Sequence, residues 1–303
     1  MSVGKQIKLL VGDNPFHGIS HLSQERTRNR GIALVNVEYF TNLLEIALRN
    51  GADGFMFSVS DVTLSILEAL CKKRIVADFE TYAIVPYAYE YVRLATQAGG
   101  LLGLGKKVIK DIILSGNVNA AILGTKGLLH TDITAFLETY LLYEISRIKT
   151  SIGRPLKLNS ILLHEVITEI ALSLDLNWLI TDYISFMRRL NISPGFETRN
   201  FAYLVRKFKE WKIDFNGLTI AAPFNKIGFQ MNPSREECEK ALLEVDGANI
   251  IGMSILAAGY FKPIETISYL GKLPNLNGVV VGVSKEQHAR ETFNLLNKYL
   301  KSR

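Results

Sequence analysis

The sequence has few features that would form covalent cross-links or cross a membrane. Its two cysteines, Cys71 and Cys238, are far apart and show no CxxC spacing, so we expect reduced thiols rather than disulfides or a thiolate metal site. The first apolar run is too short for a signal peptide and is interrupted by Asp13. No apolar run approaches the roughly 18 residues that a transmembrane helix needs. These absences predict a cytoplasmic protein without a membrane partner.

Long runs of one charge are also lacking. No five or six basic residues follow one another, and a net charge of +6 is mild for 303 residues, so we expect no nucleic-acid partner. The slight basic excess favours a small anionic substrate or solubility. An apolar content of 48% is ample for a large core. The composition therefore predicts a folded protein with a small-molecule partner, and it specifies no oligomeric state.

What the sequence does contain is a repeated rhythm of short apolar runs, each ending in a polar or glycine-rich cluster. Continuous apolar strands that alternate with helices indicate a parallel sheet covered on both faces. Eight such units in about 300 residues predict one (β/α)8 barrel domain over residues 1–303, with its active site where the strands end. The expected strands lie within residues 8–18, 54–61, 81–88, 160–165, 192–200, 217–226, 249–256 and 278–285. Helices are expected near 36–51, 61–73, 131–153, 177–190, 201–212, 234–246, 262–272 and 286–301.

One segment does not follow the rhythm. Residues 95–155 contain a glycine cluster at 98–107 and a further strand-like run at 117–124. Counting that run gives nine strands, so we expect an irregular insertion here, and residues 117–124 are either a barrel strand or part of the insertion.

Imidazoles and carboxylates follow several of the expected strands. His17 and His21 are four residues apart after the first strand, where a helix would let them share a metal; otherwise they are unrelated loop histidines. His164 and Glu165 end the fourth strand. Such a cluster suits acid–base catalysis or a divalent metal. We therefore predict His17, His164 and Glu165 as catalytic residues, and His17, His21, His164 and Glu165 as metal ligands.

Further polar residues near the other strand ends are candidates for binding substrate. Lys226, which ends the sixth strand, is the fourth predicted catalytic residue, because a lysine in an apolar barrel could form a Schiff base; the alternative is a lysine that faces solvent or binds an anion. Amide, carboxylate and guanidinium groups would orient a polar substrate. The predicted substrate-binding residues are Asp13, Asn14, Glu80, Glu197, Arg199, Asn200, Asn225, Gln230 and Asn232.

The last strand is followed by a glycine, a serine and a helix. Backbone amides at such a helix start can bind an anion, and barrels often bind phosphate near their last two strands. Gly282, Ser284 and Lys285 are therefore predicted to contact a phosphate or a phosphorylated cofactor. The simpler alternative is that Ser284 only caps the helix.

The order and style of the segments SILLHEV (160–166), LTIAAPFN (218–225) and VVVGVSKEQHARETF (279–293) within roughly 158–298 resemble the aldo-keto reductases. The resemblance implies a barrel that binds NADPH, with His164 as the substrate-side histidine. It makes Arg290 and Glu291 the counterparts of residues that hold the adenosine phosphate.

The first half departs from that family. In that family the second strand ends in an Asp with a Tyr a few residues on, and the third strand ends in a Lys. Here Phe57 or Ser58 stands at the Asp position with no tyrosine after it, and Pro86 stands at the Lys position. The family's proton donor is therefore missing unless Tyr82 or Tyr87 replaces it. An NADPH-dependent reductase is therefore an alternative rather than the leading hypothesis.

The leading hypothesis is an enzyme that acts on a small polar, phosphorylated or carbonyl-bearing metabolite by acid–base or metal-assisted chemistry, as a lyase, isomerase or hydrolase. The alternatives are the reductase, a Schiff-base lyase that uses Lys226, and a barrel that binds a ligand without catalysis.

Overall fold

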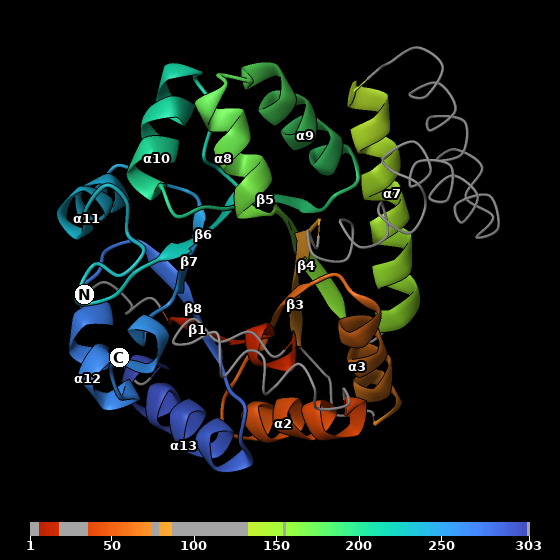
Figure 1. The fold of residues 1–303 in the computed structure, drawn as a ribbon, viewed down its shortest axis with the longest axis vertical. Helices are drawn as coiled ribbons and strands as arrows, with labels where there is room; N and C mark the ends of the chain where they lie inside the picture. Colours follow the sequence, from red (N-terminus) through yellow and green to blue (C-terminus); the bar gives the residue numbers. More distant parts are fainter. Residues whose placement is uncertain (1–5, 18–35, 74–78, 87–132, 154–155, 302–303) are drawn as a thin grey trace.

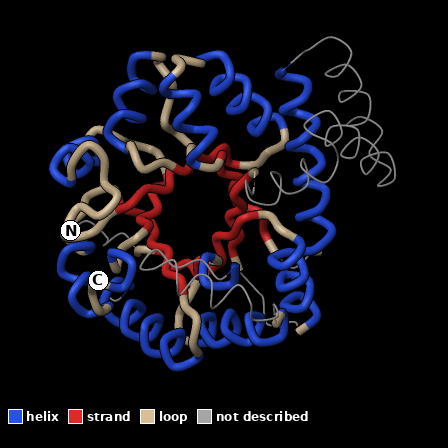
Figure 2. Tube along the Cα trace, viewed as in Figure 1, coloured by secondary structure: helices blue, strands red, loops and turns tan. Residues whose placement is uncertain are grey.

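Eight strands form the wall of the molecule. In the computed structural model, which describes residues 6–17, 36–73, 79–86, 133–153 and 156–301, each strand pairs in parallel with the next and β8 pairs with β1. The sheet is therefore a closed barrel, seen as the central ring in Figure 2. The predicted (β/α)8 fold is confirmed. The strands are β1 (Lys8–Gly12), β2 (Gly54–Ser58), β3 (Glu80–Val85), β4 (Lys157–Leu163), β5 (Ser193–Glu197), β6 (Thr219–Pro223), β7 (Asn249–Met253) and β8 (Leu276–Gly282).

Helices surround the ring of strands (Figure 1). They follow the strands at nearly all the places that the sequence predicts, and none in the described part of the chain is long and apolar enough to span a bilayer. The helices are α2 (Val37–Arg49), α3 (Asp61–Lys72), α7 (Ile133–Ile152), α8 (Glu165–Ser173), α9 (Asn177–Arg189), α10 (Phe201–Glu210), α11 (Arg235–Leu243), α12 (Pro263–Leu270) and α13 (Glu286–Leu296). The short helical turns are η1 (Asn14–His17), η2 (Ala257–Gly259) and η3 (Asn297–Lys301).

The ends of α2 show why local sequence fixes the helix boundaries. The Asn36 side chain accepts a hydrogen bond from the Tyr39 backbone N–H at 2.9 Å, which satisfies a donor that the first turn leaves open. Gly51, just past the other end, has a φ of +104°, and a Cβ at this position would clash with Asn297. Glycine is therefore required here both for the backbone conformation and for the packing of η3.

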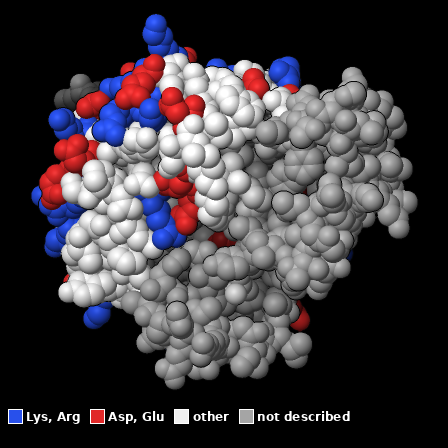
Figure 3. All heavy atoms as spheres, turned by 45° about the horizontal axis from the view of Figure 1, so that its top comes forward, with Lys and Arg blue, Asp and Glu red and all other residues white. Residues whose placement is uncertain are grey.

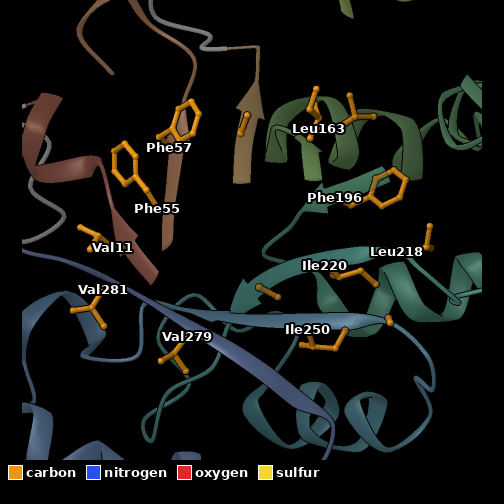
Figure 4. Close-up of a cluster of buried hydrophobic side chains, with 14 of the residues drawn as sticks. Val11, Phe55, Phe57, Leu163, Phe196, Leu218, Ile220, Ile250, Val279 and Val281 are labelled. Carbon is orange, nitrogen blue, oxygen red and sulfur yellow. The ribbon is translucent and has the colours of Figure 1, made fainter. Parts of the chain in front are cut away.

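Side chains alternate along each strand between two apolar layers. The outer layer lies between the strands and the helices, where Phe55, Phe57 and Phe196 are fully buried (Figure 4). Burying each such ring contributes about 1.5–3 kcal/mol. The inner layer fills the middle of the barrel, so the barrel is packed rather than hollow there. The inner layer consists of Leu10, Met56, Tyr82, Ile84, Leu162, Ala221 and Ile251.

The connection between β3 and β4 fits the insertion alternative for this segment. The eight barrel strands form without residues 117–124, which lie outside the described residues. The later part of the expected insertion is the regular helix α7, which packs against α3 and α9 and covers the outside of the barrel at this point.

One difference from the prediction lies after β4. No helix is predicted between residues 165 and 177, yet α8 starts directly after the strand. Glu165 is therefore the first residue of a helix and not the end of a strand.

Candidate active site

The candidate site lies at the carboxyl ends of β1, β4 and β5. β1 ends at Gly12, β4 at Leu163 and β5 at Glu197. In all closed parallel barrels the carboxyl ends of the strands share one rim. Hydrogen bonds and an ion pair join the polar groups that follow β4 and β5, and the carboxylate of Asp13 after β1 acts on them electrostatically.

His164 is the single residue between β4 and α8. Its Nδ1 accepts a hydrogen bond from the Val166 backbone N–H at 3.2 Å and so caps the helix. Burial lowers the pKa of this imidazole below the ordinary histidine value, and the positive charge of Arg199 acts in the same direction. At neutral pH the ring is therefore uncharged. Because Nδ1 accepts, we assign the proton to Nε2, which leaves an N–H donor for a ligand.

Glu197 ends β5 beside that histidine. Its Oε2 accepts a hydrogen bond from the Glu165 backbone N–H at 3.3 Å. Burial raises the pKa of the Glu197 carboxyl to about 8, and the negative charge of Glu165 raises it further. Most Glu197 side chains therefore carry a proton at pH 7. A mostly protonated carboxyl group and an uncharged imidazole at the ends of neighbouring strands can donate and accept protons near physiological pH.

Arg199 and Glu165 form an ion pair at the edge of the site. Arg199 Nε lies 2.6 Å from Glu165 Oε2, and both side chains are partly exposed. The pair occupies the Glu165 carboxylate, so this group is not the free base that the sequence predicts. The two terminal nitrogens of Arg199 have no hydrogen-bond partner in the described part of the chain and are available to a ligand.

Asp13 and His17 lie at the end of β1. Asp13 Oδ2 accepts a hydrogen bond from the Ser58 backbone N–H at 2.7 Å and lies 3.1 Å from His17 Nε2. Both side chains are only 6% exposed, so this pair holds η1 against β2. The Asp13 carboxylate also acts electrostatically on His164 and Glu197, which places the end of β1 across from them.

Glu80 does not belong to this site, and its predicted role was wrong. It is the first residue of β3, so it lies at the amino end of the barrel. There its carboxylate accepts hydrogen bonds from Lys8 Nζ at 2.6 Å and from the Tyr82 hydroxyl at 2.6 Å. The Tyr82 hydroxyl thus points to the amino end of the barrel and cannot replace a proton donor at the carboxyl end. Tyr87 lies outside the described residues.

Lys226 faces solvent, which is the second of the two alternatives for this residue. Its side chain is exposed, with Nζ 5.9 Å from the centre of the Phe261 ring. The apolar enclosure that would favour a neutral lysine amine is absent at this position. Asn225 is buried, and its amide is used to hold a loop, because Nδ2 donates to the Phe229 carbonyl and Oδ1 accepts from the Phe229 N–H, both at 2.8 Å.

The remaining predicted substrate-binding residues are mostly engaged with the protein. The Asn200 amide donates to Glu169, and Gln230 Oε1 accepts from the Ser254 hydroxyl at 3.3 Å. The Asn232 backbone N–H donates to the Arg199 carbonyl at 3.0 Å, so it supports the turn that carries Arg199. Asn14 is exposed at the start of η1.

The turn after β8 is built differently from a serine-capped helix. Lys285 is the residue that precedes α13, and the Ser284 carbonyl accepts a hydrogen bond from the Tyr39 hydroxyl at 3.1 Å. The proposed cap by Ser284 was therefore wrong. A Cβ at Gly282 would lie 2.9 Å from Pro15, so this glycine is needed for η1 to pack. Arg290 and Glu291 are exposed on α13.

The residues predicted to bind a metal do not fit one in the described part of the chain. No three His, Cys, Asp or Glu side chains gather there in a way that could hold an ion. His164 Nδ1 is engaged by a backbone N–H and Glu165 by Arg199, while His21 lies outside the described residues. The Asp and Lys that the resemblance to aldo-keto reductases implies at the ends of the second and third strands are also missing, because β2 ends at Ser58 and β3 at Val85.

Glu169 belongs to the site region and was not predicted. It lies one turn after Glu165 on α8, and its carboxylate contacts the turn that follows β5. The spacing of two glutamates four residues apart in HEVITE was the available signal, but it becomes informative only once this segment is known to be a helix.

The surface around the helices that follow β4 and β5 carries mixed charge. Figure 3 shows basic and acidic side chains interspersed over the coloured part of this face, and the described residues form no broad area of one sign there.

The comparisons with known proteins identify the fold. No family model matches the sequence, and no curated protein matches it significantly. A candidate aldo-keto reductase from Pseudomonas aeruginosa is 11% identical, with a TM-score of 0.57 over 98% of this chain and 92% of that one. A candidate 2,5-diketo-D-gluconic acid reductase B is 10% identical, with a TM-score of 0.53 over 99% and 88% of the two chains.

Another similar structure has a different activity. Orotidine 5′-monophosphate decarboxylase from Methanocaldococcus jannaschii, solved with the inhibitor BMP, is 13% identical, with a TM-score of 0.51 over 97% of this chain and 99% of that one. At these identities the likeness shows a shared barrel fold and no shared reaction. The resemblance to aldo-keto reductases is thus confirmed for the architecture of the barrel.

Proposed function

We propose that the chain is an enzyme that moves a proton on a small carbonyl-bearing metabolite, as an isomerase or lyase, at the carboxyl end of its barrel. The observation that supports it most is the placement of Glu197 and His164 just after the paired residues Phe196 and Leu163 of β5 and β4, with the Glu197 carboxyl accepting from the N–H of Glu165, the residue after His164. Burial shifts the pKa of both groups, so that both are mostly uncharged at neutral pH. Burial that shifts the pKa values of neighbouring groups toward the working pH is typical of acid–base sites.

The two groups would act on neighbouring atoms of the substrate. In its ionised form Glu197 takes a proton from the carbon next to the carbonyl, and the electron pair of the broken C–H bond forms the enolate. His164 Nε2–H donates a hydrogen bond to the enolate oxygen, where the negative charge develops. Protonated Glu197 then returns its proton to the same carbon or, in a 2-hydroxycarbonyl substrate, to the former carbonyl carbon. In the second case His164 gives its Nε2 proton to the enolate oxygen and takes the proton of the neighbouring hydroxyl, so that the new carbonyl forms where that hydroxyl was.

The charges of the described site favour a substrate with few negative charges. The carboxylates of Asp13 and Glu165 outnumber the single guanidinium of Arg199, whose terminal nitrogens can hold one carboxylate or hydroxyl group. A phosphate on the substrate would be accommodated on the opposite side of the rim, where Lys285 precedes α13.

The proposal is tested by proton exchange with solvent, which does not require the product to be known. The purified protein is incubated in D2O with a panel of aldoses, ketoses and 2-oxo acids, and NMR follows the loss of the C–H signal next to each carbonyl. We expect exchange of one class of compound, and we expect Glu197→Gln to abolish it. Exchange that is absent for the whole panel, or undiminished in Glu197→Gln, would overturn the proposal.

The dependence of exchange on pH separates this reaction from its rivals. Because ionised Glu197 is the base, the exchange rate should rise with pH and level off above about 8. A reaction that uses the protonated carboxyl as its first proton donor, such as carbonyl reduction, would instead decline over the same range. A fluorescence change on addition of NADPH would support that reductase alternative.

A further inference from the structure

The Glu169 carboxylate joins two parts of the site that are far apart in sequence. From α8, its Oε1 accepts hydrogen bonds from the Thr198 hydroxyl at 2.7 Å and from the Arg199 backbone N–H at 3.0 Å. The same oxygen accepts from the Asn200 N–H at 3.3 Å, and Oε2 accepts from the Asn200 side-chain amide. One carboxylate therefore holds every residue of the turn between β5 and α10.

This turn carries half of the proposed machinery, and α8 carries the other half. Glu197 and Arg199 flank Thr198, which is fully buried. His164 and Glu165 begin the helix on which Glu169 lies one turn later. The bonds of Glu169 thus join the same two segments as the Glu165–Arg199 ion pair and the hydrogen bond between the Glu165 N–H and Glu197.

A purely structural role would be to cap α10. Asn200 precedes that helix and makes no side-chain cap of its own, and the Glu169 carboxylate holds this cap residue from a neighbouring helix through the Asn200 N–H and side-chain amide. Capping alone needs one or two of the four contacts. The bonds to Thr198 and to the Arg199 N–H lie on the site side of the turn and fix the residues between Glu197 and α10.

We propose that Glu169 is a positioning residue, whose carboxylate fixes the turn Thr198–Asn200 against α8 and thereby sets the spacing between His164 and the pair Glu197 and Arg199. Its meaning for catalysis rests on the proposed function, but the spacing itself is a property of the protein without substrate. It is therefore measured on the free protein.

The test follows the titration of His164 by NMR in Glu169→Ala and Glu169→Gln, with the His164 signal assigned by its loss in His164→Asn. Burial is the main cause of the low pKa of His164, so a turn that moves away and admits water should raise that pKa by several tenths of a unit. Loss of the negative charge alone would act in the opposite direction. The direction of the shift therefore separates positioning from simple electrostatics.

Glu169→Gln is the conservative comparison. Its amide oxygen can still accept from Thr198 and from the Arg199 N–H, so the turn stays in place and only the charge is lost. We therefore expect a His164 pKa equal to or slightly below that of the parent protein, and not a raised one. Thr198→Val removes one donor and should raise the pKa in the same direction by a smaller amount. This variant keeps the test valid if Glu169→Ala does not fold.

Glu239→Ala provides the matched control. Glu239 likewise joins two neighbouring helices, accepting from the Tyr269 hydroxyl at 2.8 Å, but it lies outside the site. It should lower thermal stability without moving the His164 titration. The proposal is overturned if Glu169→Ala lowers that pKa or leaves it unchanged, or if Glu239→Ala raises it equally. A raised pKa in a protein without any solvent exchange would support the positioning role and reject the proposed reaction.

Discussion

The two ends of the barrel each contain a cluster of charged side chains, and the two clusters are built in different ways. At the amino end, Glu80 receives hydrogen bonds from Lys8 and Tyr82. Burial alone would raise the pKa of Glu80, but these bonds outweigh it and lower the pKa below the ordinary value. At the carboxyl end, burial prevails and raises the pKa of Glu197 to about 8.

The difference separates a stabilising cluster from a reactive one. A carboxylate whose charge is matched by a neighbouring lysine stays ionised and holds two strands together. A carboxyl group that is buried next to other carboxylates keeps its proton until the pH approaches 8. The same residue type thus serves packing at one end and, in the proposed reaction, proton transfer at the other.

The largest expected effect comes from removing the reactive carboxyl group. Glu197→Gln should lower the rate of solvent exchange by about 10²–10⁴-fold, which is the usual contribution of general acid–base catalysis. The fold should be preserved because an amide resembles the protonated carboxyl. Exchange rates and circular dichroism spectra measure the two effects. A rate within tenfold of the parent would remove Glu197 from the mechanism.

The dependence of stability on pH should also distinguish the two ends. The folded-state pKa of Glu197 is about 8, against 4.5 for the ordinary group. Between pH 4.5 and about 8 the native state binds a proton at Glu197 that the unfolded state has lost. The free energy of unfolding therefore falls as pH rises, by at most about 1.4 kcal/mol for each pH unit in this range. Urea unfolding at pH 5, 7 and 9 should show this decline in the parent protein and a smaller one in Glu197→Gln. Equal declines in both would show that other groups cause it.

Substitutions of His164 separate its catalytic role from its capping role. His164→Asn keeps a good helix cap but lacks the ring N–H, so exchange should fall by about 10²-fold with little change in stability. His164→Ala should show the same loss of exchange and, in addition, about 1 kcal/mol lower stability. Full exchange activity in His164→Ala would instead favour a barrel that only binds a ligand.

At the amino end, Glu80→Gln should change stability and not activity. Loss of the ion pair with Lys8 should cost about 1–2 kcal/mol, because the carboxylate is largely buried and the lysine is not. The stability that Glu80 provides should be present above the ordinary glutamate pKa and be lost as pH falls through its lowered value. Glu68→Gln, in the exposed pair with Lys72, is the control and should change stability by less than about 0.5 kcal/mol.

The smallest effect is expected at Lys226. Its exposed amine is not needed for the proposed proton transfer, so Lys226→Arg should leave the exchange rate within about twofold, since solvated surface charges contribute little. Mass spectrometry after treatment with borohydride and a keto acid gives an independent reading. A stable mass increase at Lys226 would revive the Schiff-base alternative.

The fold could be predicted because its signals are local. Apolar runs such as GVVVG (278–282) end in residues that interrupt strands, and helix caps such as Asn36 mark the starts of helices. Helix α8 was missed because Val166, Ile167 and Thr168 are β-branched and extend the apolar run of β4 without a turn.

The site was harder to predict because it depends on direction and on burial. Glu80 was grouped with the rim although it begins its strand, and only the position of the strand start places it at the opposite end. The position of Lys226 near the end of β6 could be predicted from the sequence, but the direction in which its side chain points could not. Glu169 could not be recognised because its partners, Thr198 and Asn200, are brought to it only by the pairing of β4 with β5.

The direct junction of β4 and α8 at His164 has a consequence for how such a protein could acquire new substrates. The backbone N–H of His164 donates to β3, and its imidazole accepts from the first turn of α8. The ring should therefore keep its place when distant connections are exchanged. Protein engineers could therefore vary the connection between β7 and α12 to change selectivity while retaining Glu197 and His164. An insertion next to residue 164, in contrast, would displace both partners at once.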